Sequence, residues 1–280
     1  MPKIAVILPT VGRITLQQTL ASIYGQKYQD FQVLVVDDSI KQDTKVDCHS
    51  NLVLLQTGGG KGVSYARNMG ANFANSEWLA FIDDDDVWHP DKLQNQISYA
   101  NSNHLDLVLT SANVVSLINS KRPKELLQIG ESPFEALYGK PHLLHSRHYF
   151  PTASMLVRSS IFKKFYFDEN LRERENLQFL QKIFLSGARL AQMKESLVTI
   201  RYDSRQSLGR IKIDSELAWW ELVWDADEEF AKNFAIESTR NFLRGKDPIS
   251  AAIMLSRVKM PNVKQQAFKV ILRFLCSFMR

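Results

Sequence analysis

Short apolar runs alternate with amphipathic stretches through the first 110 residues of the chain. Five runs have the length and composition of buried strands: residues 3–8, 31–36, 52–55, 78–82 and 106–110. Three stretches between them place apolar side chains at helical spacing: residues 15–24, 64–74 and 91–100. Strands that are apolar on both faces and are separated by helices predict an α/β fold, with a mainly parallel sheet flanked by helices.

This alternation ends after residue 110. Residues 117–149 are polar and rich in Pro, Gly and His, which predicts a loop-rich insertion. Regular structure resumes at residues 153–158 and in a predicted helix over 175–185, and from residue 214 onward the pattern is helical. We therefore expect an α/β domain over residues 1–205 and a helical, basic C-terminal extension over residues 206–280.

Charge is distributed unevenly along the 280 residues. The net charge is +5, yet residues 240–280 hold nine Lys or Arg against Asp247 alone. The basic character thus belongs to the C-terminal residues, and we expect no nucleic-acid partner for the main domain. The two cysteines, Cys48 and Cys276, lie far apart in the sequence and have no neighbours at metal-binding spacing. With no signal peptide and no membrane-spanning run, this pattern predicts reduced thiols in a cytoplasmic, enzyme-sized protein.

Acidic residues follow two of the predicted strands. Asp37 and Asp38 come after residues 31–36, and four consecutive aspartates, residues 83–86, come after residues 78–82. Ligands of parallel sheets bind beyond the carboxyl ends of the strands, so both clusters are expected to face one crevice. Mg²⁺ and Mn²⁺ accept one or two carboxylates together with phosphate oxygens. A solvated acidic turn is the alternative, although Val87 and Trp88 directly after the acids argue against it.

A glycine-rich segment, TGGGKGVSYARNMG, spans residues 57–70. It does not match a P-loop, which requires glycine where Leu55 stands, and it does not match GxGxxG, which requires glycine at Val63. The remaining interpretation is a glycine turn before a helix, with Arg67 one turn into that helix and available to an anionic ligand. The alternative is an ordinary helix start with a surface arginine.

Five motifs occur in an order that resembles the family 2 inverting glycosyltransferases of the GT-A fold. They are ILPTVGR (7–13), VVDDS (35–39), GVSYARNMG (62–70), FIDDDDVWHPDKL (81–93) and FDENLRERENLQFLQKI (167–183). The resemblance covers roughly residues 3–205. It implies a Rossmann-like domain for binding a nucleotide diphosphate sugar and for catalysis, in which DxD-type acids hold Mn²⁺ or Mg²⁺ against the diphosphate.

The resemblance also implies roles for single residues. Seven would bind the nucleotide sugar: Pro9, Thr10, Arg13, Asp38, Arg67, Asp83 and Asp84. The first three would border the base, Asp38 would contact base or ribose, and Asp84 would lie near the ribose. Asp83 and Asp85 would be the DxD acids, with Asp85 as the principal metal ligand.

The last motif departs from the family pattern. Relatives usually carry Glu-Asp there, and the aspartate acts as the general base, whereas this chain has Glu175 followed by Asn176. An asparagine cannot accept the proton. Glu175, or Glu173 two residues earlier, is therefore expected to act as the base. A catalytically inactive nucleotide-sugar-binding protein is the alternative.

The resemblance therefore implies transfer of a sugar, with inversion, from a UDP-sugar to a hydroxyl of a glycan or lipid-linked saccharide, as in bacterial-type surface polysaccharide assembly. A haloacid-dehalogenase-type phosphatase is a further alternative, because Asp83, Asp85 and Val87 fit its motif. That motif normally opens a chain, and no later lysine and acid pair can be placed.

Two further patterns remain open. His142, His145 and His148 recur at every third residue; zinc binding is disfavoured by Pro141 and the lack of a fourth ligand, and lining of an acceptor cleft is the other interpretation. Residues 263–280 form an apolar stripe beside basic side chains. Such a helix either lies on an anionic membrane at the inner face or packs on the main domain, near the acidic residues 214–229.

Overall fold

The computed structural model describes residues 2–47, 49–116, 119–139, 148–171, 173–201, 213–244 and 247–257. The chain divides into two compact units. The first comprises residues 1–133 and 148–204, and the second comprises residues 134–147 and 205–280. Each unit is described by itself below.

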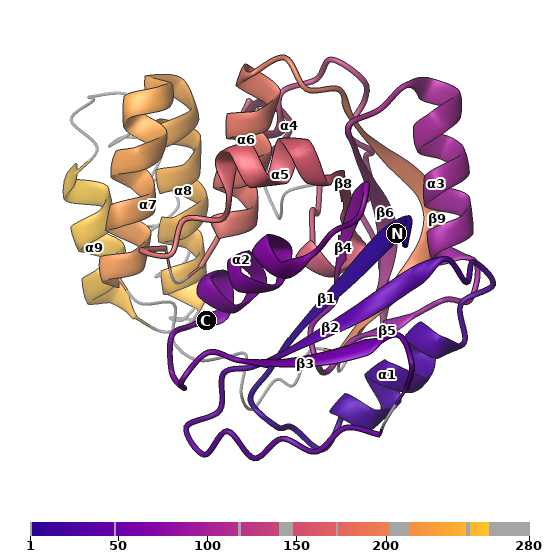
Figure 1. The fold of residues 1–280 in the computed structure, drawn as a ribbon. Coiled ribbons are helices and arrows are strands. Elements are labelled where there is room, and N and C mark those ends of the chain that lie inside the picture. Colours follow the sequence, from indigo (N-terminus) through magenta and orange to yellow (C-terminus); the bar gives the residue numbers. More distant parts are fainter. Residues whose placement is uncertain are drawn as a thin grey trace. The chain divides into compact units, whose positions relative to one another are not determined.

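The first unit is built on one mixed β-sheet (Figure 1). Within the described residues the strand order is β3-β2-β1-β4-β8-β6-β9-β5, with β7 paired to β6. The strands are β1 (Ile4–Thr10), β2 (Phe31–Asp37), β3 (Leu52–Gln56), β4 (Trp78–Phe81), β5 (Val87–Trp88), β6 (Leu107–Val115), β7 (Ser120–Arg122), β8 (Leu156–Arg158) and β9 (Leu190–Arg201).

The predicted α/β class is confirmed, with one refinement of the sheet. Strands β3, β2, β1 and β4 are parallel, as the alternation of strands and helices predicts. Strands β5, β7 and β8 run antiparallel to their neighbours. These three strands have two or three residues each, which is too short for a periodic apolar pattern to show their direction.

Helices cover both faces of this sheet. The helices of the first unit are α1 (Leu16–Tyr24), α2 (Val63–Phe73), α3 (Lys92–Asn103), the short 3-10 helix η1 (Thr152–Ser154), α5 (Ser159–Phe165) and α6 (Glu175–Leu185). Helix α4 (Pro133–Tyr138) belongs, apart from Pro133, to the second unit. Helix α1 contacts β5, and α3 contacts β6 and β9. Helix α2 contacts β1 and β2, and α5 contacts β4 and α6.

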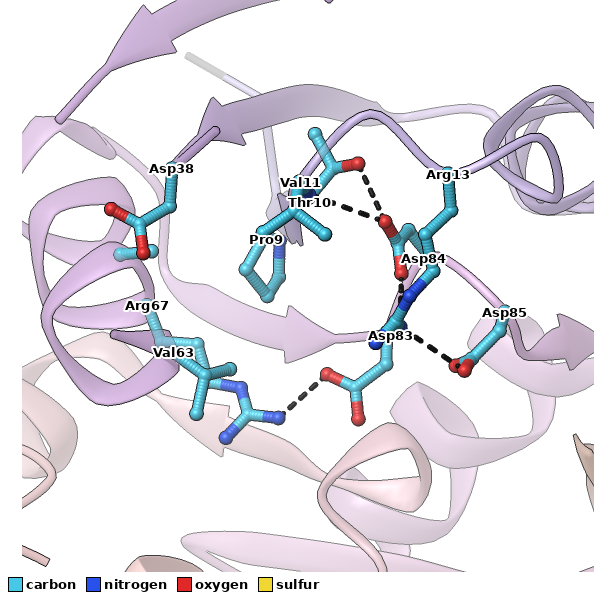
Figure 2. A pocket seen from close by; sticks show the side chains of 11 residues that line it. Pro9, Thr10, Val11, Arg13, Asp38, Val63, Arg67, Asp83, Asp84 and Asp85 are labelled. Carbon is cyan, nitrogen blue, oxygen red and sulfur yellow. Dashed lines mark hydrogen bonds and ion pairs between the residues drawn. The ribbon is translucent and has the colours of Figure 1, made fainter. Parts of the chain in front are cut away.

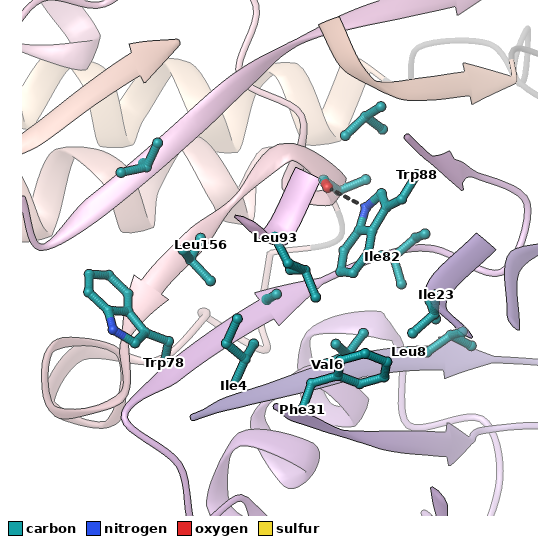
Figure 3. Packing of buried hydrophobic residues seen from close by; sticks show 14 of the residues in the cluster. Ile4, Val6, Leu8, Ile23, Phe31, Trp78, Ile82, Trp88, Leu93 and Leu156 are labelled. Carbon is teal, nitrogen blue, oxygen red and sulfur yellow. Dashed lines mark hydrogen bonds between the residues drawn. The ribbon is translucent and has the colours of Figure 1, made fainter. Parts of the chain in front are cut away.

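The first face carries a hydrophobic core of aliphatic and aromatic side chains (Figure 3). Alternate residues of β1, namely Ile4, Val6 and Leu8, are fully buried there with Ile23 of α1 and Leu93 of α3. Each such side chain contributes about 1.5–3 kcal/mol by leaving water. This core fixes the position of β1, whose carboxyl end carries the first of the predicted site residues.

The second face combines a close approach of α2 to β1 with a cluster of aromatic rings. A Cβ atom at Gly70 of α2 would stand 2.8 Å from Cγ2 of Ile7, so glycine allows the helix to approach β1. The rings of Phe81, Phe162, Phe167 and Phe179 form a cluster with centroids 5.0–5.4 Å apart. Because these rings belong to β4, α5, α6 and the segment between α5 and α6, the cluster holds the start of α6 against the sheet.

A lysine lies within the core beside the aspartate turn. Lys92 is fully buried, its Nζ is 2.7 Å from Oε1 of Gln96 and 3.9 Å from the ring centroid of Trp88, and burial lowers its pKa well below 10.5. Trp88 in turn donates from Nε1 to the carbonyl oxygen of Ala153 at 2.9 Å. Trp88 therefore packs in the interior and secures the chain directly after the four aspartates.

The described part of the second unit is helical. It contains α7 (Ile213–Ala226), α8 (Glu228–Arg244) and α9 (Pro248–Arg257). The predicted first domain, residues 1–205, includes residues 134–147, but the structure groups these with the C-terminal helices. The reason is aromatic packing, since Phe134 lies 5.7 Å from Trp219 and Tyr138 lies 5.7 Å from Phe234, measured between ring centroids.

Several predictions fall on parts of the chain that are not described. His142, His145 and residues 263–280 lie outside the described residues. His148 is described and is buried, with Nε2 3.6 Å from Oε2 of Glu125. Within the described ranges, no helix combines the length and the apolar character that crossing a membrane requires.

Candidate functional site

A cavity of about 300 Å³ opens at the carboxyl ends of β1, β2 and β4 (Figure 2). Its lining residues are Pro9, Thr10, Val11, Arg13, Asp38, Val63, Ala66, Arg67, Asp83, Asp84 and Asp85. The parallel register sets Thr10 beside Asp37, and the four aspartates begin two residues after Phe81, where β4 ends. All residues predicted to bind nucleotide or metal are therefore brought together in one cavity.

Asp84 lies in the cavity wall and ties the end of β1 to the turn after β4. Its carboxylate is buried and accepts hydrogen bonds from Oγ1 of Thr10 at 2.6 Å and from Nη1 of Arg13 at 2.8 Å. A weaker bond comes from the backbone N–H of Val11 at 3.4 Å. These contacts give Asp84 a structural role, and its position near a ribose stays a prediction.

Asp83 and Asp85 are the more accessible acids of the turn. About a third of each side chain is exposed, 36% for Asp83 and 37% for Asp85. Asp83 pairs with Nη2 of Arg67 at 2.6 Å, and Asp85 pairs with Nη1 of Arg13 at 3.1 Å. Partial burial raises the pKa of Asp85; Arg13 opposes this shift, while the neighbouring aspartates reinforce it. Two guanidinium groups thus reduce the repulsion that four adjacent carboxylates would otherwise suffer.

The fourth aspartate of the turn points away from the cavity. Asp86 is buried, and Oδ1 accepts a hydrogen bond from the backbone N–H of Arg201 at 3.3 Å. Burial raises its pKa well above 3.8, and the charges of Asp83 and Asp85 raise it further. A proton on Asp86 would lower the number of negative charges in the turn.

Asp38 organises the glycine-rich segment. Its carboxylate accepts hydrogen bonds from the backbone N–H groups of Lys61 and Gly62, both at 2.8 Å, and from the hydroxyl of Thr57. Gly62 has φ of +98°, and at Gly59, with φ of +90°, a Cβ would stand 3.0 Å from the carbonyl oxygen of Ser39. Only glycine suits such backbone. The predicted glycine turn before a helix is confirmed, and Asp38 holds it in place.

Arg67 occupies the centre of the site. It is 3% exposed, so the alternative of a surface arginine is wrong. Its Nη1 donates to Oε1 of Glu175 and its Nη2 to Oδ1 of Asp83, both at 2.6 Å, and its guanidinium carbon is 5.6 Å from the ring centroid of Phe167. Burial lowers the pKa of Arg67, but the two carboxylates outweigh that effect and raise it. Arg67 is therefore a permanent cation between two acids.

The two candidate bases differ in their surroundings. Glu175 begins α6, is buried and forms the ion pair with Arg67. Glu173 is exposed. The side chain of Asn176 donates from Nδ2 to the carbonyl oxygen of Phe150 at 2.6 Å. An aspartate at position 176 would place a carboxylate against that carbonyl, so asparagine serves a structural purpose here. Sequence reasoning missed this contact.

The open acids fit a cation that arrives with a phosphate ligand. Within the described ranges, no group of three or more His, Cys, Asp or Glu side chains is placed to hold a metal ion. Asp83 and Asp85 nevertheless offer two carboxylates at the cavity, and Mg²⁺ is typically bound through one or two carboxylates while substrate phosphates and water complete its coordination. The donor set therefore fits a metal shared between protein and ligand.

Comparisons with known proteins agree with this architecture. A structure of Staphylococcus aureus TarS, residues 1–349 in complex with UDP-GlcNAc, superposes with a TM-score of 0.64 at 20% identity, covering 97% of this chain and 80% of that one. This likeness shows that the fold is GT-A. An uncharacterized glycosyltransferase of Methanocaldococcus jannaschii, MJ1057, is 25% identical over 252 residues, or 83% of each chain.

A bacterial relative matches over a shorter stretch. The UDP-Glc:alpha-D-GlcNAc-diphosphoundecaprenol beta-1,3-glucosyltransferase WfgD of Escherichia coli is 27% identical over 118 residues. That match covers 40% of this chain and 47% of WfgD, so about half of the relative's length is spanned. The family model described as glycosyl transferase family 2 matches residues 5–166, which is more than half of the chain. This chain belongs to glycosyl transferase family 2.

Proposed function

We propose that this chain is a metal-dependent, inverting glycosyltransferase that uses a UDP-sugar and glycosylates a hydroxyl of a glycan or lipid-linked saccharide. The observation that carries the proposal is the cavity at the strand ends, in which the accessible carboxylates of Asp83 and Asp85 lie beside Arg13 and Arg67. WfgD is named as a glucosyltransferase that uses UDP-Glc and alpha-D-GlcNAc-diphosphoundecaprenol, which supports this choice of donor and acceptor. The complex of TarS with UDP-GlcNAc supports the choice of donor. We place the reaction in surface polysaccharide assembly on the cytoplasmic side.

The charge of the cavity supports metal dependence. Its lining includes four carboxylates, from Asp38 and the acids at positions 83–85, against the two guanidinium groups of Arg13 and Arg67. A diphosphate entering this cavity meets excess negative charge, which disfavours binding unless a divalent cation accompanies it. When bound at Asp83 and Asp85, Mn²⁺ or Mg²⁺ would offset the charge that develops on the leaving diphosphate.

The proposed reaction needs one proton acceptor. The acceptor oxygen attacks the anomeric carbon from the face opposite the diphosphate, the bond from that carbon to the diphosphate oxygen breaks, and its electron pair leaves with the diphosphate. The hydroxyl proton passes to a carboxylate, and we assign this role to Glu175, because the side chain of Asn176 is committed to Phe150. A diphosphate competes with Glu175 for Arg67, so donor binding would release the carboxylate for catalysis.

Two other functions are less well supported than sugar transfer. A haloacid-dehalogenase-type phosphatase is not supported, since the matching family is a glycosyl transferase family and Asp83 is paired with Arg67. A non-catalytic nucleotide-sugar-binding protein is favoured by one observation, the asparagine at position 176. A non-catalytic protein of this kind would bind the donor but would neither transfer its sugar nor hydrolyse it.

The metal proposal is tested with Asp85→Asn. We expect the variant to lose sugar transfer and to lose the Mn²⁺-dependent rise in unfolding temperature that UDP-GlcNAc produces, because it removes one of two proposed ligands. For the unaltered chain, donor at 100 times its dissociation constant stabilises by about 2.7 kcal/mol. Asp43→Asn, at an exposed aspartate outside the cavity, is the matched control and should behave like the unaltered chain. Full transfer activity in excess EDTA would contradict the proposal.

The base assignment is tested by comparing Glu175→Gln with Glu173→Gln. We expect Glu175→Gln to lower kcat by roughly 10²-fold or more, because a general base acts in the transition state. The donor KM should not rise, because the diphosphate loses a competing carboxylate at Arg67. Glu173→Gln should retain activity. If Glu173→Gln lowers kcat and Glu175→Gln does not, the assignment of the base is wrong but the proposed reaction stands. If the unaltered chain binds donor and never transfers sugar, it is a binding protein.

We also propose that residues 263–280 attach the protein to an anionic membrane. Their apolar stripe and basic side chains are the support, and a lipid-linked acceptor would make attachment useful. We expect the full chain to co-sediment with anionic liposomes at low salt and to be released at high salt, and a chain that ends at Pro261 to remain soluble. Absence of binding by the full chain, with loss of thermal stability on truncation, would mean instead that these residues pack on the protein.

A further inference from the structure

A second, larger hollow lies beside α2 and is separate from the strand-end cavity. Its volume is about 450 Å³, and its polar lining comes from α2, α6 and the segment between α5 and α6. Its lining includes the polar side chains of Asn68, Asn72, Tyr166, Glu169 and Lys182. We call these five residues and the hollow that they line the polar groove.

A third hollow of about 410 Å³ lies between the polar groove and the strand-end cavity. It is lined by residues 60–64 together with Glu169 and Leu171. It shares Val63 with the strand-end cavity and Glu169 with the polar groove. The three hollows therefore adjoin one another along α2 through these shared lining residues.

The chemistry of the polar groove suits a neutral saccharide. Sugar hydroxyls donate to carboxylates such as Glu169 and accept from amides and from an ammonium group such as Lys182. The apolar face of a pyranose ring packs on an aromatic side chain, and Tyr166 lines the groove. Because Asp168 also lines the hollow, two acids stand against one lysine, and an anionic ligand gains little from entering.

The polar groove is held in shape before any ligand binds. Nδ2 of Asn68 donates to the carbonyl oxygen of Phe167 and to Oε1 of Glu169, both at 2.9 Å, and Oδ1 of Asn68 accepts from the N–H of Phe167 at 3.0 Å. Tyr166 has φ of +47° and ψ of 166°, a backbone conformation that is strained for a residue with a side chain. Its hydroxyl donates to Oδ1 of Asn72. Strain of this kind, fixed by surrounding contacts, concentrates at ligand sites.

The polar groove is also connected to the proposed catalytic residues. The segment that carries Tyr166 and Glu169 continues into Glu175, and the ring of Phe167 lies under the guanidinium group of Arg67. A ligand that contacts this segment would therefore contact the part of the chain that leads to the proposed base, Glu175. This connection favours an acceptor over an unrelated sugar.

We propose that the polar groove is a second carbohydrate-binding site, which holds neutral pyranose units of a glycan acceptor beyond the unit that receives the new sugar. The assignment to the acceptor rests on the proposed glycosyltransferase function. The carbohydrate-binding site itself does not, because it is separate from the donor cavity and can be tested without donor or turnover.

The test is a titration of the full-length, ¹⁵N-labelled protein with laminaritriose and, separately, with triacetylchitotriose, at millimolar concentrations and without nucleotide. We expect saturable shifts of the side-chain amide signals of Asn68 and Asn72 with at least one trisaccharide. Tyr166→Ala and Glu169→Ala should each weaken that binding about tenfold or more, which corresponds to about 1.4 kcal/mol. Phe73→Ala, at an exposed residue of the same helix outside the groove, is the control and should bind normally.

Each outcome bears on one proposal at a time. If neither trisaccharide shifts the two amide signals, or if the shifts persist unchanged in both Tyr166→Ala and Glu169→Ala, the groove proposal is wrong. The metal-dependent thermal shift with UDP-GlcNAc, measured on the same variants, reports separately on the donor cavity and should be unchanged. A preserved donor shift with no trisaccharide binding would reject the groove alone. Trisaccharide binding with no shift from either UDP-GlcNAc or UDP-Glc would reject the proposed function alone.

Discussion

The buried guanidinium group of Arg67 is the interaction on which the rest of the site depends. It joins three elements that are distant in sequence: α2, the turn after β4 and the first residue of α6. Without it, the carboxylates of Asp83 and Glu175 would lose the cation that both of them contact. Removing one member of a buried ion pair typically costs about 3–5 kcal/mol, because the remaining charge is left without compensation. The position of the proposed base is thus an electrostatic consequence of one arginine.

The fold prepares this arrangement from both sides. Gly70 lets α2 lie close to β1, which sets the depth of Arg67, and the aromatic cluster around Phe167 and Phe179 holds α6 in place. The aspartate turn is secured from the opposite face by Trp88. Charge in the turn is then divided among partners: Asp84 binds Thr10 and Arg13, while Asp86 is buried with a raised pKa. Only Asp83 and Asp85 keep accessible oxygens for a ligand.

Sequence reasoning found the site because its signals are local. Strands that end in acids must gather those acids at one edge of a parallel sheet, and a glycine turn before a helix must place Arg67 near the same edge. The roles of Asp38 and Asp84 could not be found this way, because both depend on partners that the fold supplies, such as the N–H groups of Lys61 and Gly62. The contact of Asn176 with Phe150 and the packing of Phe134 on Trp219 likewise join segments whose proximity no periodic pattern encodes.

The central claim, that Arg67 holds Asp83 and Glu175 in one electrostatic unit, is tested most directly by the free energy of unfolding in a double-mutant cycle. Chemical denaturation of Arg67→Met, Glu175→Gln and the double variant gives the coupling energy between the two side chains. We expect Arg67→Met alone to lower the unfolding free energy by about 3–5 kcal/mol, and the added Glu175→Gln to restore part of the loss, because it removes the orphaned charge. Two effects that simply add, within about 0.5 kcal/mol, would contradict the account.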